Sequence, residues 1–78
     1  MPRFFFNVYD DLIVNDEEGA VLPNLEAARL QALIGARDLM CEQVRHGYIV
    51  LSHWIDVIDD EGTLVLHLPF RDAIDIRG

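Results

Sequence analysis

The 78-residue sequence contains no lysine: its six basic residues are all arginines and stand against 14 acidic residues, which leaves a net charge of −8. This charge repels phosphate backbones and anionic lipid, so we expect neither a nucleic acid nor a membrane as partner. A basic protein or a cation is favoured as partner, although acidic charge that merely keeps a small domain in solution is the simpler interpretation.

Cysteine is also scarce, since Cys41 is the only one and no internal disulfide can form. Small secreted domains usually need several disulfides. No apolar run approaches the roughly 18–20 residues of a membrane span. We therefore expect a cytoplasmic protein. Hydrophobic residues make up 51% of the chain, which argues against disorder, and the length predicts a single domain over residues 1–78.

Motifs that carry chemistry are missing as well. His46, His53 and His67 are too scattered for a zinc-binding pattern, and one cysteine does not complete one. The acidic segments 10–18 and 59–61 lack the spacing of a calcium loop. Neither a nucleophile elbow nor a phosphate-binding or dinucleotide-binding glycine motif occurs. We expect no catalytic residue, no metal and no cofactor, and a protein that is not an enzyme.

Strands are predicted before the longest periodic segment. Residues 3–9 are rich in aromatic and β-branched side chains, and period two places Phe4, Phe6 and Val8 together on the face that should meet the core. A short second strand is expected at residues 12–14. Residues 20–22 either extend that strand or lead into a helix.

A single helix is predicted over residues 25–45, with Asn24 as its N-cap and Gly47 as its stop. One apolar stripe has alanines at four-residue spacing, which lets the helix lie close to a sheet: Leu25, Ala28, Ala32, Ala36, Leu39 and Met40. A second stripe holds Leu30, Ile34 and Cys41. Because one helix on one sheet buries only one stripe, the second must be exposed, covered by a loop or used at an interface.

A hairpin is predicted after the helix, with strands at 53–59 and 63–68 joined by the turn 60–62. Residues 48–51 form an apolar link that can be strand-like, and residues 70–74 can form a helical turn. The inner face of the hairpin should carry Ile55, Val57, Leu64, Leu66 and Leu68, and the outer face Trp54, Asp56, Ile58, Val65 and His67. The whole pattern predicts an α+β fold in β-β-α-β-β order, an antiparallel sheet of three to four strands with one long helix packed on one face.

The order of segments resembles a small bacterial domain family of unknown function. The features that carry the resemblance span nearly the whole chain: the strand 2–8, the acidic turn 16–19, the segment 22–28, the turn 60–62 and the segment 66–70. The resemblance implies a stand-alone domain with no known activity, and it carries over no catalytic residue.

A weaker likeness is to the partial RNase-H-like domain of HicB-type antitoxins. In those proteins strands precede a helix rich in Glu and Ala, as in residues 25–29 here. Such antitoxins are acidic and bind a small basic toxin. The glycine–cysteine turn that is typical before their helix is replaced here by Leu22-Pro23-Asn24.

Two apolar surfaces remain once one core has been assigned. The possible protein interface comprises the outer sheet face and the second helix stripe, with residues Phe5, Tyr9, Trp54, Ile58, Val65, Leu30, Ile34 and Cys41. Exposed apolar patches often mark protein association, whereas the charge opposes base stacking. Partial coverage of the sheet face by residues 48–51 or by the C-terminal residues is the alternative. We expect a non-enzymatic domain that self-associates or binds another protein, or else an antitoxin-like acidic binder of a small basic protein.

Overall fold

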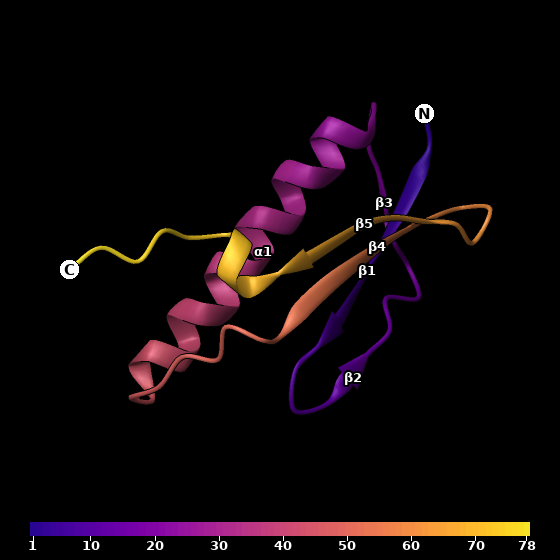
Figure 1. The fold of residues 1–78 in the computed structure, drawn as a ribbon. Helices are drawn as coiled ribbons and strands as arrows, with labels where there is room; N and C mark the ends of the chain where they lie inside the picture. Colours follow the sequence, from indigo (N-terminus) through magenta and orange to yellow (C-terminus); the bar gives the residue numbers. More distant parts are fainter.

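A computed structural model describes residues 1–78 as a five-stranded antiparallel sheet with one long helix on one face (Figure 1). The elements are β1 (Arg3–Tyr9), β2 (Ile13–Val14), β3 (Ala20–Val21), α1 (Leu25–Arg45), β4 (Trp54–Asp59), β5 (Leu64–Pro69) and the 3-10 turn η1 (Phe70–Asp72). The α+β class is confirmed. The strand count of three to four was too low, because the segments on either side of the acidic turn form two separate short strands.

Strand β1 lies inside the sheet, whose order is β2-β1-β4-β5. Val8 of β1 pairs with Val14 of β2, and Phe4 of β1 pairs with Ala20 of β3. Both short strands therefore occupy the same side of β1, and residues 15–19 between them form no strand. On the other side of β1, all six residues of β4 pair in register with residues 4–9.

Helix α1 begins as the sequence predicts, because Asn24 Oδ1 accepts the Ala27 N–H at 2.9 Å. The alanine stripe is buried against the sheet and η1, in a cluster with Phe4, Ile55, Val57, Leu68, Phe70 and Ala73. Small side chains let the helix axis come close to the strands, so one helix closes the core. Leu25, expected in this stripe, is 47% exposed instead, because it lies in the first turn beyond the packed region.

The hairpin contains an irregularity that the alternation of residues does not reveal. Val57 pairs with Leu66 but Ile58 pairs with Leu64, so the register shifts by one residue at Val65. The inward placement of Leu64 was therefore wrong: its side chain is 53% exposed, opposite outward Ile58. The outward placement of Val65 was wrong too, since its half-buried side chain packs against the core. A bulge of this kind reverses the facing of every residue on one side of it.

A buried polar side chain holds the segment that follows the helix. Gln43 Oε1 accepts the Val50 N–H at 3.0 Å, and Gln43 Nε2 donates to His53 Nδ1 at 3.2 Å. His53 Nε2 lies 3.7 Å from Asp11 Oδ1. Residues 48–51 are not a strand, and the Val50 N–H bonds to the Gln43 side chain rather than to another strand. No helix combines the length and the apolar character that crossing a bilayer requires.

Candidate protein interface

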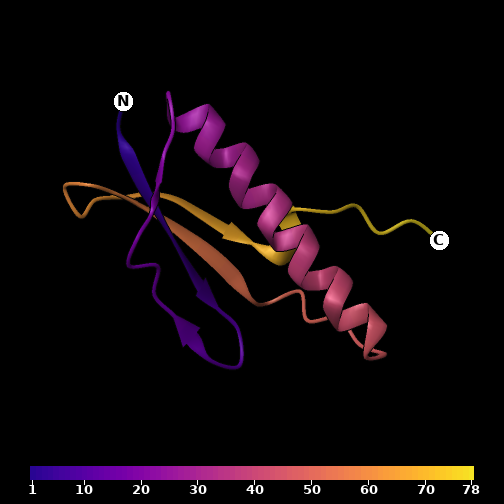
Figure 2. The same cartoon turned by 180° about the vertical axis from the view of Figure 1, so that it is seen from behind.

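The outer face of the sheet, opposite α1, carries no helix (Figures 1 and 2). The strand register arranges its side chains in three rows that run across β1, β4 and β5. These rows are Phe5–Ile58–Leu64, Asn7–Asp56–His67 and Tyr9–Trp54–Pro69. An apolar row and an aromatic row thus flank a polar row.

Aromatic rings on this face are stacked on one another. The Tyr9 and Trp54 rings have centroids 5.0 Å apart and planes inclined by 9°. The His67 ring lies beside the Trp54 ring of this pair, and the two ring centroids are 5.6 Å apart. Such offset aromatic contacts are worth about 0.5–1.5 kcal/mol beyond area burial. Contacts within one chain therefore hold these aromatic side chains in place.

Asp56 connects the polar row to the aromatic row. Its Oδ2 accepts from Trp54 Nε1 at 3.3 Å, and its Oδ1 is 2.6 Å from His67 Nδ1. Because a carboxylate can only accept, the histidine donates. The Asp56 side chain is only 17% exposed, whereas that of His67 is half exposed. A shielded carboxylate thereby fixes the orientation of both rings.

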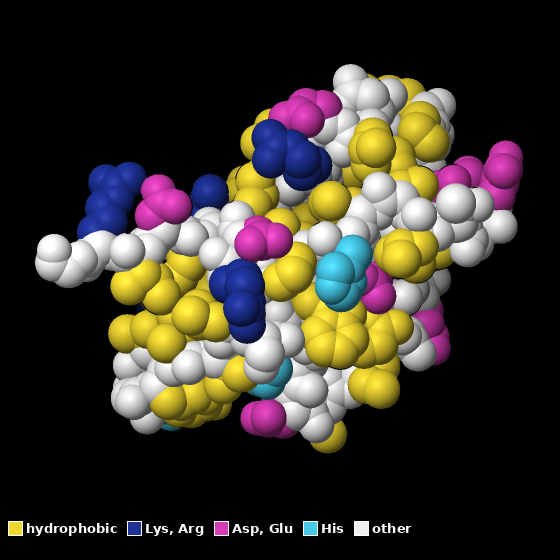
Figure 3. Space-filling view, in the orientation of Figure 1, with side chains coloured by type: hydrophobic (Ala, Val, Ile, Leu, Met, Phe, Trp, Pro, Cys, Tyr) yellow, Lys and Arg dark blue, Asp and Glu magenta, His cyan; other side chains and the backbone are white.

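The structure brings together only part of the expected interface. Phe5, Tyr9, Trp54 and Ile58 lie half-buried on the outer face, and Leu64 joins them because of the bulge. Val65 does not belong to this face. Leu30, Ile34 and Cys41 are exposed on the side of α1 that faces away from the sheet, so they form a separate surface. Figure 3 shows hydrophobic side chains over much of the face in view, with histidine and acidic groups among them.

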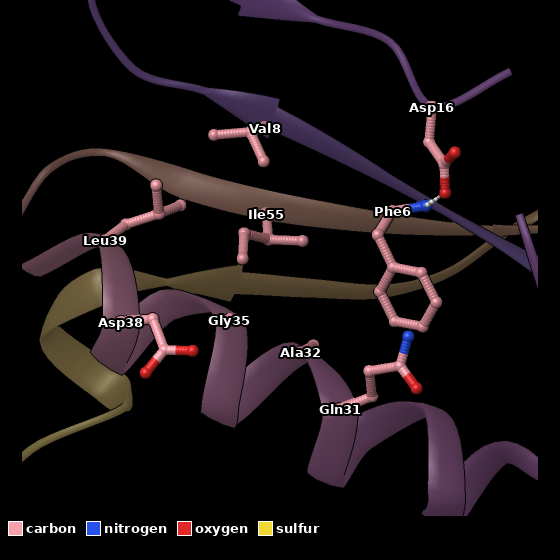
Figure 4. Close-up of a pocket in the computed structure, with 9 residues that line it drawn as sticks. All are labelled: Phe6, Val8, Asp16, Gln31, Ala32, Gly35, Asp38, Leu39 and Ile55. Carbon is pink, nitrogen blue, oxygen red and sulfur yellow. Dashed lines mark hydrogen bonds between the residues drawn. The ribbon is translucent and has the colours of Figure 1, made fainter.

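A groove of about 370 Å³ between α1 and β1 was not anticipated from the sequence. It arises because the helix packs chiefly on β4, β5 and η1 and leaves the inner side of β1 partly open. Phe6, Val8 and Ile55 form one wall and Gly35 and Leu39 the other (Figure 4). The remaining lining residues are Ala32, Gln31, Asp38 and Asp16. No single position in the sequence signals this groove, since it depends on where the helix crosses the sheet.

Asp16 closes the loop at the end of this groove. Its Oδ2 accepts the Phe6 N–H at 3.1 Å, and its Oδ1 accepts those of Glu18 and Gly19 at 3.2 and 3.0 Å. Partial burial raises the pKa of the Asp16 carboxyl, but the three backbone donors outweigh burial, so the pKa is lowered overall. From the sequence alone, Asp16 is only one carboxylate of an acidic turn.

The remaining titratable side chains form no metal centre. No group of three or more histidine, cysteine, aspartate or glutamate side chains is placed to hold an ion. Cys41 is exposed, and His46 Nε2 lies 3.1 Å from Glu42 Oε1, at the end of the helix. Every buried polar side-chain atom has a hydrogen-bond partner.

Comparison with known proteins identifies a family for this chain. Neither the curated proteins nor the solved structures yield a significant counterpart. The model of a domain of unknown function, DUF6894, matches residues 3–71. This match spans the strand, acidic-turn, helix and hairpin segments that carried the resemblance to such a family, whereas nothing in it points to HicB-type antitoxins. The chain belongs to the DUF6894 family.

Proposed function

We propose that this domain works by binding another protein through the outer face of its sheet. The observation that carries the proposal is the stacked pair of Tyr9 and Trp54, ordered on a face that no helix covers. Tryptophan and tyrosine are the residues most enriched among those that dominate binding energy at protein interfaces. A rigid aromatic pair loses little conformational entropy on binding.

The polar row supports the same use of this face. A carboxylate in the centre of an interface is costly when it lacks partners. Asp56 already has two, Trp54 and His67, so a partner that covers it need not supply a donor. The apolar row of Phe5, Ile58 and Leu64 adds hydrophobic area beside it.

The chemistry of the partner follows from charge. A net charge of −8 attracts a basic surface at long range and repels an acidic one. We therefore propose a basic protein, and the small basic toxins bound by HicB-type antitoxins are one example of that chemistry. The face itself supplies apolar and aromatic contacts, so the partner should present apolar side chains within a basic rim.

The test compares proteins captured by the immobilised wild-type domain, a Trp54→Thr variant and a Leu30→Ser/Ile34→Ser control. Threonine keeps a high strand propensity while it removes the indole ring, and circular dichroism checks the fold of each variant. A protein retained by the wild type and the control but lost with Trp54→Thr is then purified. We expect it to bind at least tenfold more weakly to Trp54→Thr. Equal binding to all three domains would contradict the proposal.

A further inference from the structure

The sheet ends at β5, and no element of the chain pairs with its outer edge. The C-terminal residues that follow η1 lead away from the sheet (Figures 1 and 2). Residues 64–69 include no aspartate, glutamate, lysine or arginine, in a chain whose net charge is −8. Natural proteins protect such an edge with charged side chains, prolines or bulges; β5 has no charged side chain, and its bulge at Val65 and its Pro69 lie near its two ends, with His67 between them.

Backbone geometry shows which groups face outward on β5. The Phe70 N–H donates to His53 O at 2.8 Å, just beyond the Trp54–Pro69 pair. In an antiparallel ladder this makes Trp54–Pro69 a non-hydrogen-bonded pair, and Asp56–His67, two residues along, is one as well. The close side chains of Asp56 and His67 agree with this, since such pairs lie closer together. The N–H and C=O of His67 therefore point away from β4.

The neutral strand lies between an acidic turn and an exposed arginine that is followed by Asp72. The acidic turn with Asp60 and Glu61 precedes it, and Arg71 follows it. Arg71 makes no ion pair within the chain, although six other basic or histidine side chains do, namely Arg29, Arg45, Arg77, His46, His53 and His67. When two copies of this strand run antiparallel, the acidic turn of each lies beside Arg71 of the other. The edge is therefore complementary to itself in both hydrogen bonding and charge.

We propose that two copies of this chain pair through β5, antiparallel, to form one continuous sheet across a twofold axis near His67. This contact is isologous, because the same strand contributes on both sides. The axis is perpendicular to the sheet, so both helices lie on one side and both outer faces on the other. The proposal does not depend on the outer face binding a partner, and the dimer leaves that face open.

The opposite edge does not offer this contact. It consists of two short strands interrupted by residues 15–19 and flanked by Asp10, Asp11, Glu17 and Glu18. A second copy there would bring acidic groups against acidic groups. The contact between the two copies is therefore formed by β5 of each chain.

The first experiment measures mass by sedimentation velocity on the full chain, from micromolar concentrations up to about 1 mM, the range in which a short edge contact dissociates. We expect a concentration-dependent dimer. His67→Pro removes the outward N–H but no bond to β4, and proline is tolerated on an edge strand of this kind. His67→Ala is the matched control, since it removes the same side chain and keeps the N–H. We expect His67→Pro to be a folded monomer and His67→Ala to remain dimeric.

The second experiment tests the charged ends. Arg71→Glu places an acidic group beside the acidic turn of the other copy, and Glu61→Arg places a basic group beside Arg71 of the other copy, so each variant should dimerise about tenfold more weakly than the wild type. Mixing the two restores both opposite-charge contacts, and we expect a heterodimer in native mass spectrometry at close to wild-type affinity. A wild-type monomer at every concentration, a His67→Pro dimer, or no preference for the mixed dimer would overturn the proposal. Trp54→Thr separates the two surfaces, because it should abolish partner capture and leave the dimer intact.

Discussion

The two edges of this sheet are closed by different means. The β2/β3 edge is interrupted and acidic, and polar contacts hold it to β1: Asp16 accepts a backbone N–H group from β1 and two from its own loop, and Asn7 Oδ1 accepts the Asp16 N–H at 2.8 Å. The β5 edge is a single uncharged strand with one bulge, and it is anchored by burial of Leu68 and of Phe70, whose side chain has no exposed surface. Only the second edge consists of one strand, which is six residues long.

This difference shows how a small domain can protect one edge while it presents the other. Hydrogen bonds to a carboxylate are directional and use up the polar groups of the edge they close. Burial of an apolar side chain is non-directional, so it anchors a strand without using its outward groups. The effects of substitutions on the free energy of unfolding should therefore differ between the two edges, both in size and in pH dependence.

The largest effect should come from Phe70→Ala, at the apolar anchor of the β5 edge. Loss of a fully buried Phe side chain costs about 3–5 kcal/mol, and a domain of this length has roughly 4–12 kcal/mol of stability. The free energy of unfolding, measured by urea denaturation, should fall by that amount at every pH between 5 and 8. Phe70→Leu is the control, with about 1 kcal/mol expected from its smaller change in volume. Equal losses in the two variants would mean that burial is not what anchors this edge.

Gly19→Ala should be the next largest and tests the opposite edge. Gly19 has φ +70°, and an added Cβ would lie 2.7 Å from Phe4 O, a backbone atom of β1. The left-handed conformation alone costs about 1–2 kcal/mol for alanine, and displacement of the strand adds to it, so we expect about 2–4 kcal/mol in urea denaturation. Gly62→Ala is the matched control, because φ is +83° and nothing lies within 4 Å. A loss of stability as small as that of Gly62→Ala would show that the loop moves away from β1 at little cost.

Asp16→Asn should have an intermediate effect that depends on pH. The amide nitrogen of asparagine cannot accept, so at least one of the backbone donors is left without a partner, at a cost of about 1.5–3 kcal/mol. The folded-state pKa of Asp16 is lowered below its unfolded value. Its carboxylate therefore stabilises the fold above the unfolded pKa of about 3.9, and this contribution is lost as pH falls through the lower folded value. As the pH is lowered from 5 to 2.5, the urea concentration at the midpoint of unfolding should become similar for the wild type and Asp16→Asn.

A parallel measurement on Asp60→Asn supplies the control for general charge effects. Asp60 is exposed in the hairpin turn and accepts no hydrogen bond from within the chain. Its variant should keep a nearly constant difference from the wild type over the same pH range. If Asp60→Asn converges with the wild type as Asp16→Asn does, net charge rather than the loop contacts governs acid stability.

The sequence was sufficient for the elements whose pattern is local. Asn24, the alanine spacing and Gly47 delimit the helix, and residues 3–9 alternate regularly, so each was predicted within a residue of the structure. The hairpin strands at β4 and β5 were also predicted closely. These signals depend on propensity and period alone, which neighbouring residues carry themselves.

What the sequence could not supply depends on pairing between distant residues. The bulge at Val65 exists because β5 has one residue more than β4 can match, so Leu64 faces outward although the alternation places it inward. The roles of Asp16 and Gln43 are equally non-local, since their partners lie on other elements. The stacked pair of Tyr9 and Trp54 was foreseen as two residues on one face, but their contact required the register of β1 with β4.

The smallest effect should come from Ile34→Ser on the outward side of α1, away from both edges. Ile34 is 58% exposed, and isoleucine and serine have similar helix propensities, so stability should change by no more than about 0.5 kcal/mol. If β5 is the dimer contact, the dissociation constant from sedimentation should also stay unchanged. A shift in that constant comparable to that of Arg71→Glu would place the contact between copies on the helix and end the distinction between the two edges. Leu33→Ser serves as the positive control for stability, because Leu33 packs against the core one position earlier on the same helix.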